Sequence, residues 1–451
     1  MPASVVLELQ EKQLALRSDS LFRRPEFWMV LVAFATRMAV MPFLIGEQLS
    51  PELDHWRFGY EAGRIARSII QGHGFSSPLF SNTGSTAWMT PVYPYIVAGF
   101  FKVFGVYTLA SAVALLTFNA LVSALTSIPI FLIAKRTFGD RTARWAGWIW
   151  AVFPYAIYFP MERLWETWLA TLLLSCIFLL GLKLEDEPTN LRGWIGFGAL
   201  WGLAALTSPT LLSILPLWGA WIGYRFYRQG RNWLMPSAAT LLTLTLVVSP
   251  WFVRNYVVFH KFIPFRDNMG MVLRLGTKGN SNHWAQYELG PWHNQDEWQQ
   301  FQQLGELGYM AKEKRQAFQS IAQHPVWYVW TSFRRMIFIW SGYWSFDRAY
   351  LRQEPLDLPN IFFSSTCTVL ALFGLWRAFR RSFDRAMPYL VALFSFPAIY
   401  YITSPEAYYR RPLDPLLVIL IAYALSATKR HRRRQKTKWT EEREMEALLV
   451  T

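Results

Sequence analysis

The chain has 451 residues, of which 53% are hydrophobic, 17% aromatic and only 17% charged. This charged fraction lies below the roughly 25% of soluble domains, and the apolar residues form runs that are too long for soluble helices. Two cysteines exclude a disulfide-rich secreted fold, and the apolar content excludes a disordered chain. The composition therefore indicates a polytopic membrane protein.

The formal net charge of +15 points to the membrane rather than to nucleic acid, because most basic residues lie in short loops between apolar segments. The densest basic run, 429–438, directly follows the last apolar segment. A juxtamembrane cluster of this kind is typical of a cytoplasmic anchor on anionic lipid headgroups. The first apolar run begins near Phe27 after a charged lead, so we expect a retained signal anchor rather than a cleaved signal peptide.

The apolar runs predict about ten membrane-spanning helices, within a range of ten to twelve. A bilayer core about 30 Å thick needs roughly 20 apolar residues per helix. Pro209 marks a break within 193–225, where we favour a tight hairpin over one long broken helix. The predicted spans are 26–46, 111–134, 143–160, 163–183, 193–207, 208–225, 233–253, 360–377, 387–404 and 411–428.

Two further hydrophobic stretches, 88–105 and 324–343, have an ambiguous length for a span. Short basic loops favour the cytoplasmic side of a membrane. If neither of these stretches crosses the membrane, all the basic loops lie on one side of it, together with both chain termini. We therefore predict that both form interfacial helices on the outer face.

These assignments predict an all-α protein of a bacterial inner membrane, with both termini in the cytoplasm and the polar chemistry outside. Two extracytoplasmic regions would interrupt the membrane domain. The predicted parts are a cytoplasmic segment 1–25, a membrane domain 26–428 with outer regions 47–110 and 254–359, and a basic tail 429–451.

Glu61 is the first candidate catalytic residue, because it follows the first span closely at the outer boundary. A carboxylate there could take a proton from an acceptor hydroxyl or bind a metal ion. The alternative is an ion pair with Arg64 or Arg57 on a solvated helix face. Asp54 is a rival for the same catalytic role.

A second acidic pair, Glu162 and Glu166, lies in the short outer loop before the fourth predicted span. At this spacing both carboxylates would share one face of a helix start, where negative charge favours the positive end of the helix dipole. Helix capping is therefore an equal alternative to catalysis. As a catalytic group, Glu166 would meet Glu61 across the rim of a cavity.

The segment 404–417 places Tyr409, Arg410 and Arg411 just outside the final span. Guanidinium groups at this position suit a phosphate, which arginine can bind through two parallel hydrogen bonds. The alternative is that these arginines only extend toward lipid headgroups.

Residues 250–280 end the seventh span with Arg254 and continue into a basic, glycine-containing loop with Lys278. Such a loop could contact phosphate or sugar hydroxyls. The sequence has no nucleotide-binding fingerprint that would indicate an ATP-driven pump, and no cysteine and histidine spacing typical of a metal site.

These four elements, in this order, resemble the polyprenyl-phosphate-dependent glycosyltransferases of the GT-C superfamily. The branch is the bacterial family 39-like one, related to protein O-mannosyltransferases and the lipid A aminoarabinose transferase. The resemblance covers roughly residues 25–428. It rests on EAGRIARSI from Glu61, TPVYP from Thr90, LIAKRTFG from Leu132, PWFVRNY from Pro250 and YYRRPLDP from Tyr408.

The resemblance implies that Glu61 is the catalytic base and Glu166 the second outer-loop carboxylate. It also implies that Arg410, with Tyr409 beside it, contacts the donor phosphate, and that Arg254 and Lys278 are weaker candidates. The family often has an acidic residue a few positions earlier, where this chain has Phe58 and Gly59. This departure keeps Asp54 open as the base.

A departure also occurs in the late motif, where Tyr408 replaces the first arginine of the family's R-Y-R pattern.

The implied reaction moves a sugar, with inversion, from polyprenyl phosphate to a hydroxyl of a lipid, protein or glycan acceptor. No cofactor is implied with certainty, and Mg²⁺ or Mn²⁺ held by Glu61 and Glu166 stays open. Two rival functions remain, a lipid-linked glycan flippase and a glycan polymerase or ligase with a diphosphate-linked donor.

Overall fold

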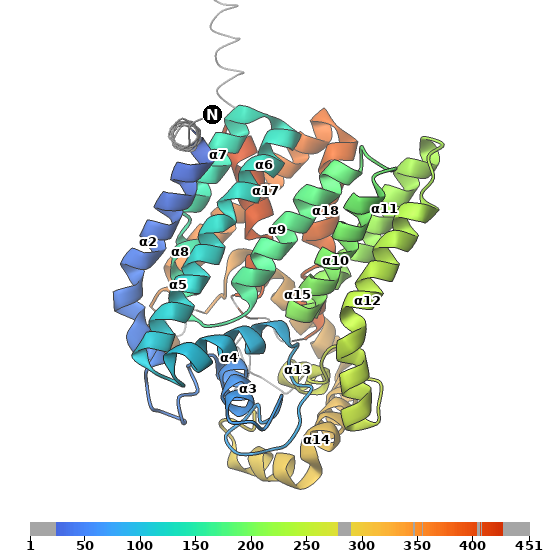
Figure 1. Cartoon of the computed structure of the whole chain (residues 1–451). Coiled ribbons are helices and arrows are strands. Elements are labelled where there is room, and N and C mark those ends of the chain that lie inside the picture. The colour runs from blue at the N-terminus through green and yellow to red at the C-terminus, as the bar shows by residue number, and fades with distance from the viewer. Residues whose placement is uncertain are drawn as a thin grey trace, which may run out of the picture.

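The computed structural model shows a bundle of long helices that carries a smaller helical cap at one end (Figure 1). The structure describes residues 24–277, 290–345, 348–353, 355–403, 406 and 408–426. Both predicted terminal segments therefore lie almost wholly outside the described residues.

Most helices of the bundle run along its long axis. They are α2 (Pro25–Gln48), α5 (Leu109–Leu125), α6 (Ser127–Phe138), α7 (Asp140–Ala151), α8 (Pro154–Glu162), α9 (Thr167–Leu184), α10 (Leu191–Thr207), α11 (Leu215–Arg228), α12 (Leu234–Phe259), α17 (Asp357–Arg381), α18 (Phe383–Ser395) and the helical residues 414–426. Shorter connecting elements are η1 (Pro209–Ser213), α16 (Arg348–Gln353), α19 (Ala398–Ile402) and η3 (Arg411–Leu413).

Five helical stretches among the described residues are long and apolar enough to cross a membrane, with a mean hydropathy of 1.5 to 1.9. These stretches are α2, the continuous pair α5 and α6, α9, α12 and α17. The prediction of a multi-pass helical membrane protein is thus confirmed, while the count of about ten spans stays a prediction. The region around Pro209 forms the favoured hairpin, because α10 ends at Thr207 and α11 starts after the short helix η1.

Close packing in the bundle depends on small residues. On α10, a Cβ atom at Gly198 would approach the Thr240 carbonyl oxygen to 2.4 Å, and one at Gly202 would approach Val247 to 2.7 Å. Two glycines at this spacing let the backbones of α10 and α12 meet closely, as in many membrane helix pairs.

The cap consists of α3 (Tyr60–Ile70), α4 (Val92–Phe104), α13 (Met269–Leu275) and α14 (Gln295–Gln323). It lies at the end of the bundle opposite the start of α2 (Figure 1). Both regions predicted to face outward therefore meet at one end. The basic junctions between α6 and α7, α11 and α12, and α17 and α18 lie at the other end.

The two stretches predicted to be interfacial form α4 and α15 (Pro325–Ser341). In Figure 1, α4 lies across the ends of the long helices instead of continuing them. Helix α15 packs against α17 and α19, and one of its faces exposes Val326, Val329, Trp330 and Phe333. Their position at the membrane interface stays a prediction.

Candidate active site

A cavity of about 480 Å³ lies where the cap meets the bundle. Its wall combines α3, the turn before α9, the loop before α13 and the segment that leads into the last helix. The polar and aromatic side chains on this wall are Glu52, Trp56, Arg57, Tyr60, Glu61, Trp88, Arg163, Trp165, Glu166, Arg266, Asn268, Trp292, His293, Tyr400, Tyr408 and Tyr409.

Glu61 lies in the first turn of α3, where the helix dipole favours a carboxylate. The turn before it is tight: a Cβ atom at Gly63 would lie 1.9 Å from the Phe58 carbonyl oxygen, so only glycine fits there. The Glu61 side chain is buried in the cavity wall and accepts a hydrogen bond from the Trp88 side chain. Burial raises the pKa of Glu61 to about 7, although Arg64 and Arg163 oppose this shift.

The ion pairs that the sequence offered as an alternative for Glu61 form elsewhere. Arg64 pairs with Asp54 at 2.7 Å, and Arg57 pairs with Glu47 at 3.1 Å. Glu61 is thus left facing the cavity with a raised pKa, which is typical of a group that exchanges protons.

Glu166 directly precedes α9 and makes no capping hydrogen bond to that helix. Its Oε2 atom is buried and has no hydrogen-bond partner among the residues that the structure describes. Burial raises the pKa of Glu166 to about 7, Arg266 lowers it, and the charge of Glu61 raises it further. Glu166 thus occupies the N-cap position of α9 without a side-chain capping hydrogen bond, and it faces the same cavity as Glu61. Glu162, in contrast, forms an ion pair with Arg163 at 3.4 Å.

Asp54 lies outside the cavity wall in an ion-paired cluster. Its carboxylate contacts Arg64 at 2.7 Å and Arg67 at 2.9 Å, and about half of its side chain is exposed. Burial raises its pKa, but the hydrogen bonds and charges of the two arginines outweigh burial and leave the pKa below its ordinary value. Asp54 therefore holds the turn before α3 in place.

Arg410 does not meet Glu61 in the cavity, which corrects the expected geometry. Its guanidinium is buried and donates to the Ile339 carbonyl at 2.9 Å and to Ser364 Oγ at 3.2 Å, with Asp414 at 3.6 Å. The physical reason is the spacing to Asp414, which places an acid one helical turn further along.

Arg411 is also turned away from the cavity. It pairs with Asp414 at 3.0 Å and stacks over the Tyr155 ring, 3.6 Å from its centroid. Both arginines therefore brace the start of the last helix inside the protein. Tyr409, as expected, does lie on the cavity wall, with Tyr408 beside it.

Arg254 has a bracing role as well. Its guanidinium donates to the carbonyls of Thr86 at 2.7 Å and Phe75 at 2.8 Å, which ties α12 to the first cap region. Lys278, the other basic candidate in this part of the chain, lies outside the described residues.

Arg163 and Arg266 line the cavity, where Arg163 was not considered from the sequence and Arg266 was expected only as one of the basic residues of the loop that could contact phosphate. Arg163 lies 4.4 Å from the ring centroid of Tyr408 and 5.1 Å from that of Tyr60. Arg266 acts on the pKa of Glu166, so the two groups lie within electrostatic reach. The one sequence signal for Arg266 was its place in the basic loop after α12.

Directly after Arg266 in the chain, Asp267 forms a buried acid pair with Glu306 of α14. Glu306 on α14 accepts hydrogen bonds from Thr86 Oγ1 at 2.5 Å and from the Ala87 amide at 2.6 Å. Asp267 lies within electrostatic reach of Glu306, and its own amide donates to the Ala87 carbonyl at 3.0 Å. Burial raises the pKa of both carboxyl groups, which favours a proton held between them.

A metal site is not preformed in the part of the chain that the structure describes. No group of three or more histidine, cysteine, aspartate or glutamate side chains there is arranged to hold a metal ion. Glu61 and Glu166 supply two carboxylates, and Mg²⁺ commonly binds one or two carboxylates together with substrate phosphates.

Sequence comparison connects part of this chain to a known family. Residues 89–254 match the family model described as dolichyl-phosphate-mannose-protein mannosyltransferase. No curated protein sequence matches the chain.

Solved structures give a broader likeness. The apo oligosaccharyltransferase of Archaeoglobus fulgidus superposes with a TM-score of 0.52 at 15% identity, over 93% of this chain and 52% of that chain. Its complex with Zn and sulfate superposes with a TM-score of 0.52 at 16% identity, over 91% of this chain and 50% of that chain. The archaeal oligosaccharyltransferase AglB from the same organism was solved in complex with an inhibitory peptide and a dolichol-phosphate. It superposes with a TM-score of 0.51 at 14% identity, over 92% of this chain and 51% of that chain.

The chain spans about half the length of the oligosaccharyltransferase that it matches. At such low identity the likeness concerns the fold, and it extends over nearly all of this chain. The protein therefore shares the helical membrane fold of this archaeal oligosaccharyltransferase.

Proposed function

We propose that this protein is a membrane glycosyltransferase that transfers a sugar from a polyprenyl-phosphate donor to an acceptor hydroxyl. The observation that carries this proposal is the convergence of Glu61 and Glu166 with Arg163 and Arg266 on one cavity. The family model of residues 89–254 supports it. The related fold was also solved with a dolichol-phosphate, which is a polyprenyl phosphate.

Glu61 is the proposed catalytic base. Its raised pKa of about 7 leaves a large share of the carboxylate ionised near neutral pH, and the basicity is higher than that of an ordinary glutamate. The acceptor oxygen attacks the anomeric carbon of the sugar while the bond from that carbon to the phosphate oxygen breaks. The acceptor proton passes to Glu61, and polyprenyl phosphate leaves with the bonding electrons.

Arg266 and Arg163 are the proposed contacts of the donor phosphate, in place of Arg410. As the bond to the sugar breaks, negative charge grows on the phosphate, and fixed guanidinium groups stabilise this charge. Glu166 lies next to Arg266 and is proposed to orient it or the acceptor. A divalent ion bound by Glu61 and Glu166 would supply further positive charge beside the phosphate.

The proposed location of the reaction is the outer face of a bacterial inner membrane. The basic junctions of the bundle lie at the end where α2 starts, and the cavity lies at the other end (Figure 1). Basic loops favour the cytoplasmic side. This assignment keeps both termini inside and the membrane domain within residues 26–428.

The decisive experiment compares Glu61→Gln with the wild-type protein in proteoliposomes that receive labelled polyprenyl-phosphate sugar. We expect a loss of turnover of about 100-fold or more, the usual contribution of a general base, with donor binding retained. Glu47→Gln is the matched control, because Glu47 is exposed and outside the cavity. Full turnover in Glu61→Gln would place the base elsewhere.

The same assay separates the rival functions. Movement of the labelled lipid across the membrane without a new glycosidic bond would indicate a flippase. Transfer from a diphosphate-linked donor but not from a monophosphate-linked one would indicate a polymerase or ligase.

A further inference from the structure

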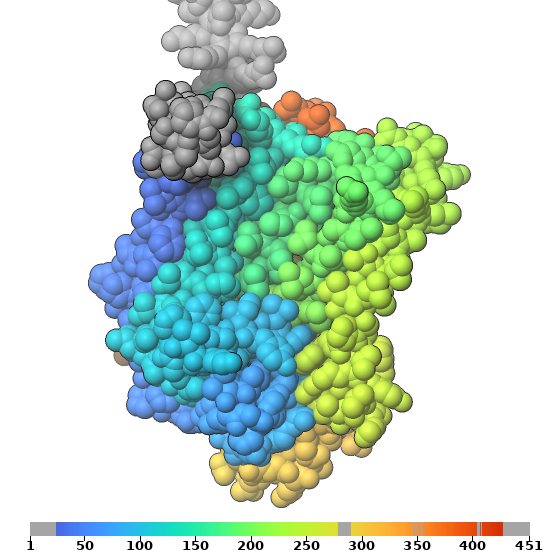
Figure 2. Space-filling model, viewed as in Figure 1, coloured from blue at the N-terminus to red at the C-terminus, as the bar shows by residue number. Residues whose placement is uncertain are grey.

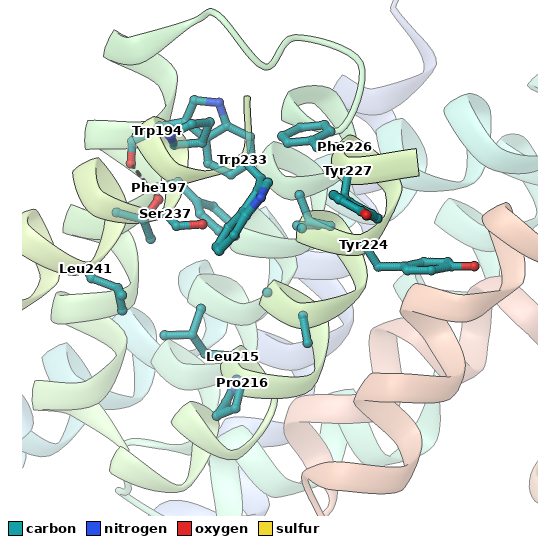
Figure 3. A pocket seen from close by; sticks show the side chains of 16 residues that line it. Trp194, Phe197, Leu215, Pro216, Tyr224, Phe226, Tyr227, Trp233, Ser237 and Leu241 are labelled. Carbon is teal, nitrogen blue, oxygen red and sulfur yellow. Dashed lines mark hydrogen bonds between the residues drawn. The ribbon is translucent and has the colours of Figure 1, made fainter. Parts of the chain in front are cut away.

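A second hollow lies between α10, α11 and α12, near the end of the bundle opposite the cap (Figure 3). Its volume is about 660 Å³, within the range of ligand-binding pockets. We call this hollow the α10–α12 groove. Its wall consists of Trp194, Phe197, Leu215, Pro216, Gly219, Ala220, Ile222, Gly223, Tyr224, Phe226, Tyr227, Trp233, Pro236, Ser237, Thr240 and Leu241.

The groove exists because α11 has glycines where a larger side chain would fill the space. A Cβ atom at Gly219 would meet no atom within 4 Å, and one at Gly223 would meet only Trp233, at 4.0 Å. Helices α10 and α12 approach each other closely at Gly198 and Gly202, so the open space lies between this pair and α11. Figure 3 shows the open space between the side chains of these helices.

The groove has the depth of one membrane leaflet. From Pro216 to Tyr227 the α11 wall rises about 16 Å at 1.5 Å per residue, and half of a hydrocarbon core is about 15 Å. Its polar wall atoms are few. Thr240 donates its hydroxyl to the Trp194 carbonyl. Such a wall suits a hydrocarbon chain.

Aromatic and basic side chains lie at the end of the groove that is farthest from the cap. Tyr227 and Trp233 are exposed there, as is usual at the level of lipid headgroups. Arg228 and Arg231 are exposed in the same turn, and Arg228 donates to the Tyr224 hydroxyl at 3.2 Å. Within the described residues no carboxylate lies within ion-pair distance of either arginine, although Asp384 lies within electrostatic reach of Arg228. Arg225, one turn earlier, is instead neutralised by a close contact with Glu185.

We propose that the α10–α12 groove binds one anionic phospholipid, with an acyl chain along α11 and its phosphate between Arg228 and Arg231. The apolar wall would accept any acyl chain, so the two arginines provide the preference for negative charge. A second protein copy is a poorer occupant, because a symmetric contact here would bring the same exposed arginines toward each other. This inference is independent of the proposed transferase activity.

Native mass spectrometry of the purified full chain in detergent tests the proposal, with phosphatidylglycerol or phosphatidylcholine added at equal concentrations. We expect the wild-type protein to retain one phosphatidylglycerol in preference to phosphatidylcholine. The double variant Arg228→Gln/Arg231→Gln should bind phosphatidylglycerol about 30-fold more weakly, since each basic residue near a lipid surface contributes about fivefold. Gly219→Leu should weaken the binding of both lipids, because it fills the groove.

Matched controls make the result specific. Arg141→Gln/Arg144→Gln removes the same charge from exposed positions on α7, at the same end of the bundle. Gly196→Leu adds the same side chain to α10 at an open position that does not line the groove. The controls should retain wild-type binding.

Three results would overturn the proposal. The first is a loss of less than about fivefold in Arg228→Gln/Arg231→Gln, or an equal loss in its control pair. The second is unchanged phosphatidylglycerol binding in Gly219→Leu. The third is a dimer that disappears in Gly219→Leu, which would assign the groove to a second copy of the chain.

Discussion

The two hollows of this protein are built in different ways. The polar cavity collects its wall from segments that are far apart in the chain, between Glu52 and Pro412, and it contains carboxylates and arginines. The α10–α12 groove takes its wall from residues 194–241 and contains no ionisable side chain apart from tyrosine. In Figure 2 the blue cap segments lie at one end of this face and α11 with the start of α12 at the other, while the rest of α12 runs along the face to the cap.

This difference shows what each kind of site requires. Burial shifts a pKa only where a titratable group is enclosed, and enclosing Glu61 and Glu166 takes contributions from both cap regions and the bundle. An apolar groove needs only helices of suitable side-chain size. The proposed catalysis thus depends on segments that are far apart in the chain, while the proposed lipid binding depends on helices that follow one another in the chain.

The largest expected effect distinguishes Arg266, which lines the cavity, from Arg410, which is buried outside the cavity. Arg266→Gln should lower kcat/KM about 100-fold with an unchanged melting temperature, because it removes charge that stabilises the leaving phosphate. Arg410→Gln should lower the stability by about 1–3 kcal/mol, because the Ile339 carbonyl and Ser364 lose a buried donor while Asp414 keeps Arg411. Steady-state kinetics and thermal unfolding in detergent measure both. A large kinetic loss in Arg410→Gln without loss of stability would restore Arg410 as the phosphate contact.

The pH dependence of transfer should report the raised pKa of Glu61. A base must be deprotonated, so kcat/KM should fall about tenfold per pH unit below about 7 and level off above it. An ordinary glutamate would give this fall below about 4.3 instead. Measurements from pH 5 to 8.5 check the prediction. A flat profile over this range would contradict the raised pKa of Glu61. It would also remove the enclosure that distinguishes the polar cavity from the α10–α12 groove.

The smallest expected effect concerns the acid pair that supports the cavity. The folded-state pKa of Asp267 is raised, so its contribution to stability is present at low pH and is lost as the pH rises through about 7. Asp267→Asn removes this loss. Its melting temperature should therefore exceed that of the wild type by a few degrees at pH 8.5, corresponding to about 1 kcal/mol, and the advantage should shrink toward pH 5.

Asp296→Asn is the control for this prediction, because Asp296 is exposed in the first turn of α14. Parallel melting curves of Asp267→Asn and wild type at every pH would show that the pair does not share a proton.

The expectations for Glu61 and Glu166 were useful because their positions relative to the spans can be derived from the sequence. Glu61 follows the first apolar run closely and Glu166 lies at the start of a later one, so the sequence predicts both at the same membrane boundary. The alternatives, ion pairing for Glu61 and capping for Glu166, depended on neighbours within one helical turn. The structure gives those arginines other partners and leaves α9 without a side-chain cap.

The expectation for Arg410 failed for the opposite reason. An exposed arginine at a helix start and a buried one have the same local sequence, and only the packing of Ile339 and Ser364 around it distinguishes them. Arg266 could not be singled out from its loop, because Asp267 and Glu306, which position that loop, are 39 residues apart in the chain.

The sequence by itself determined the helical membrane class, and it predicts the spans, the side that the basic loops favour and the boundary at which the acids lie. These properties follow from hydropathy and charge summed over short windows, so they need no knowledge of distant contacts. Only the tertiary structure decided which arginines face the acids and which brace the last helix. That choice depends on desolvation and pairing, and both are set by whichever segments pack around a charge.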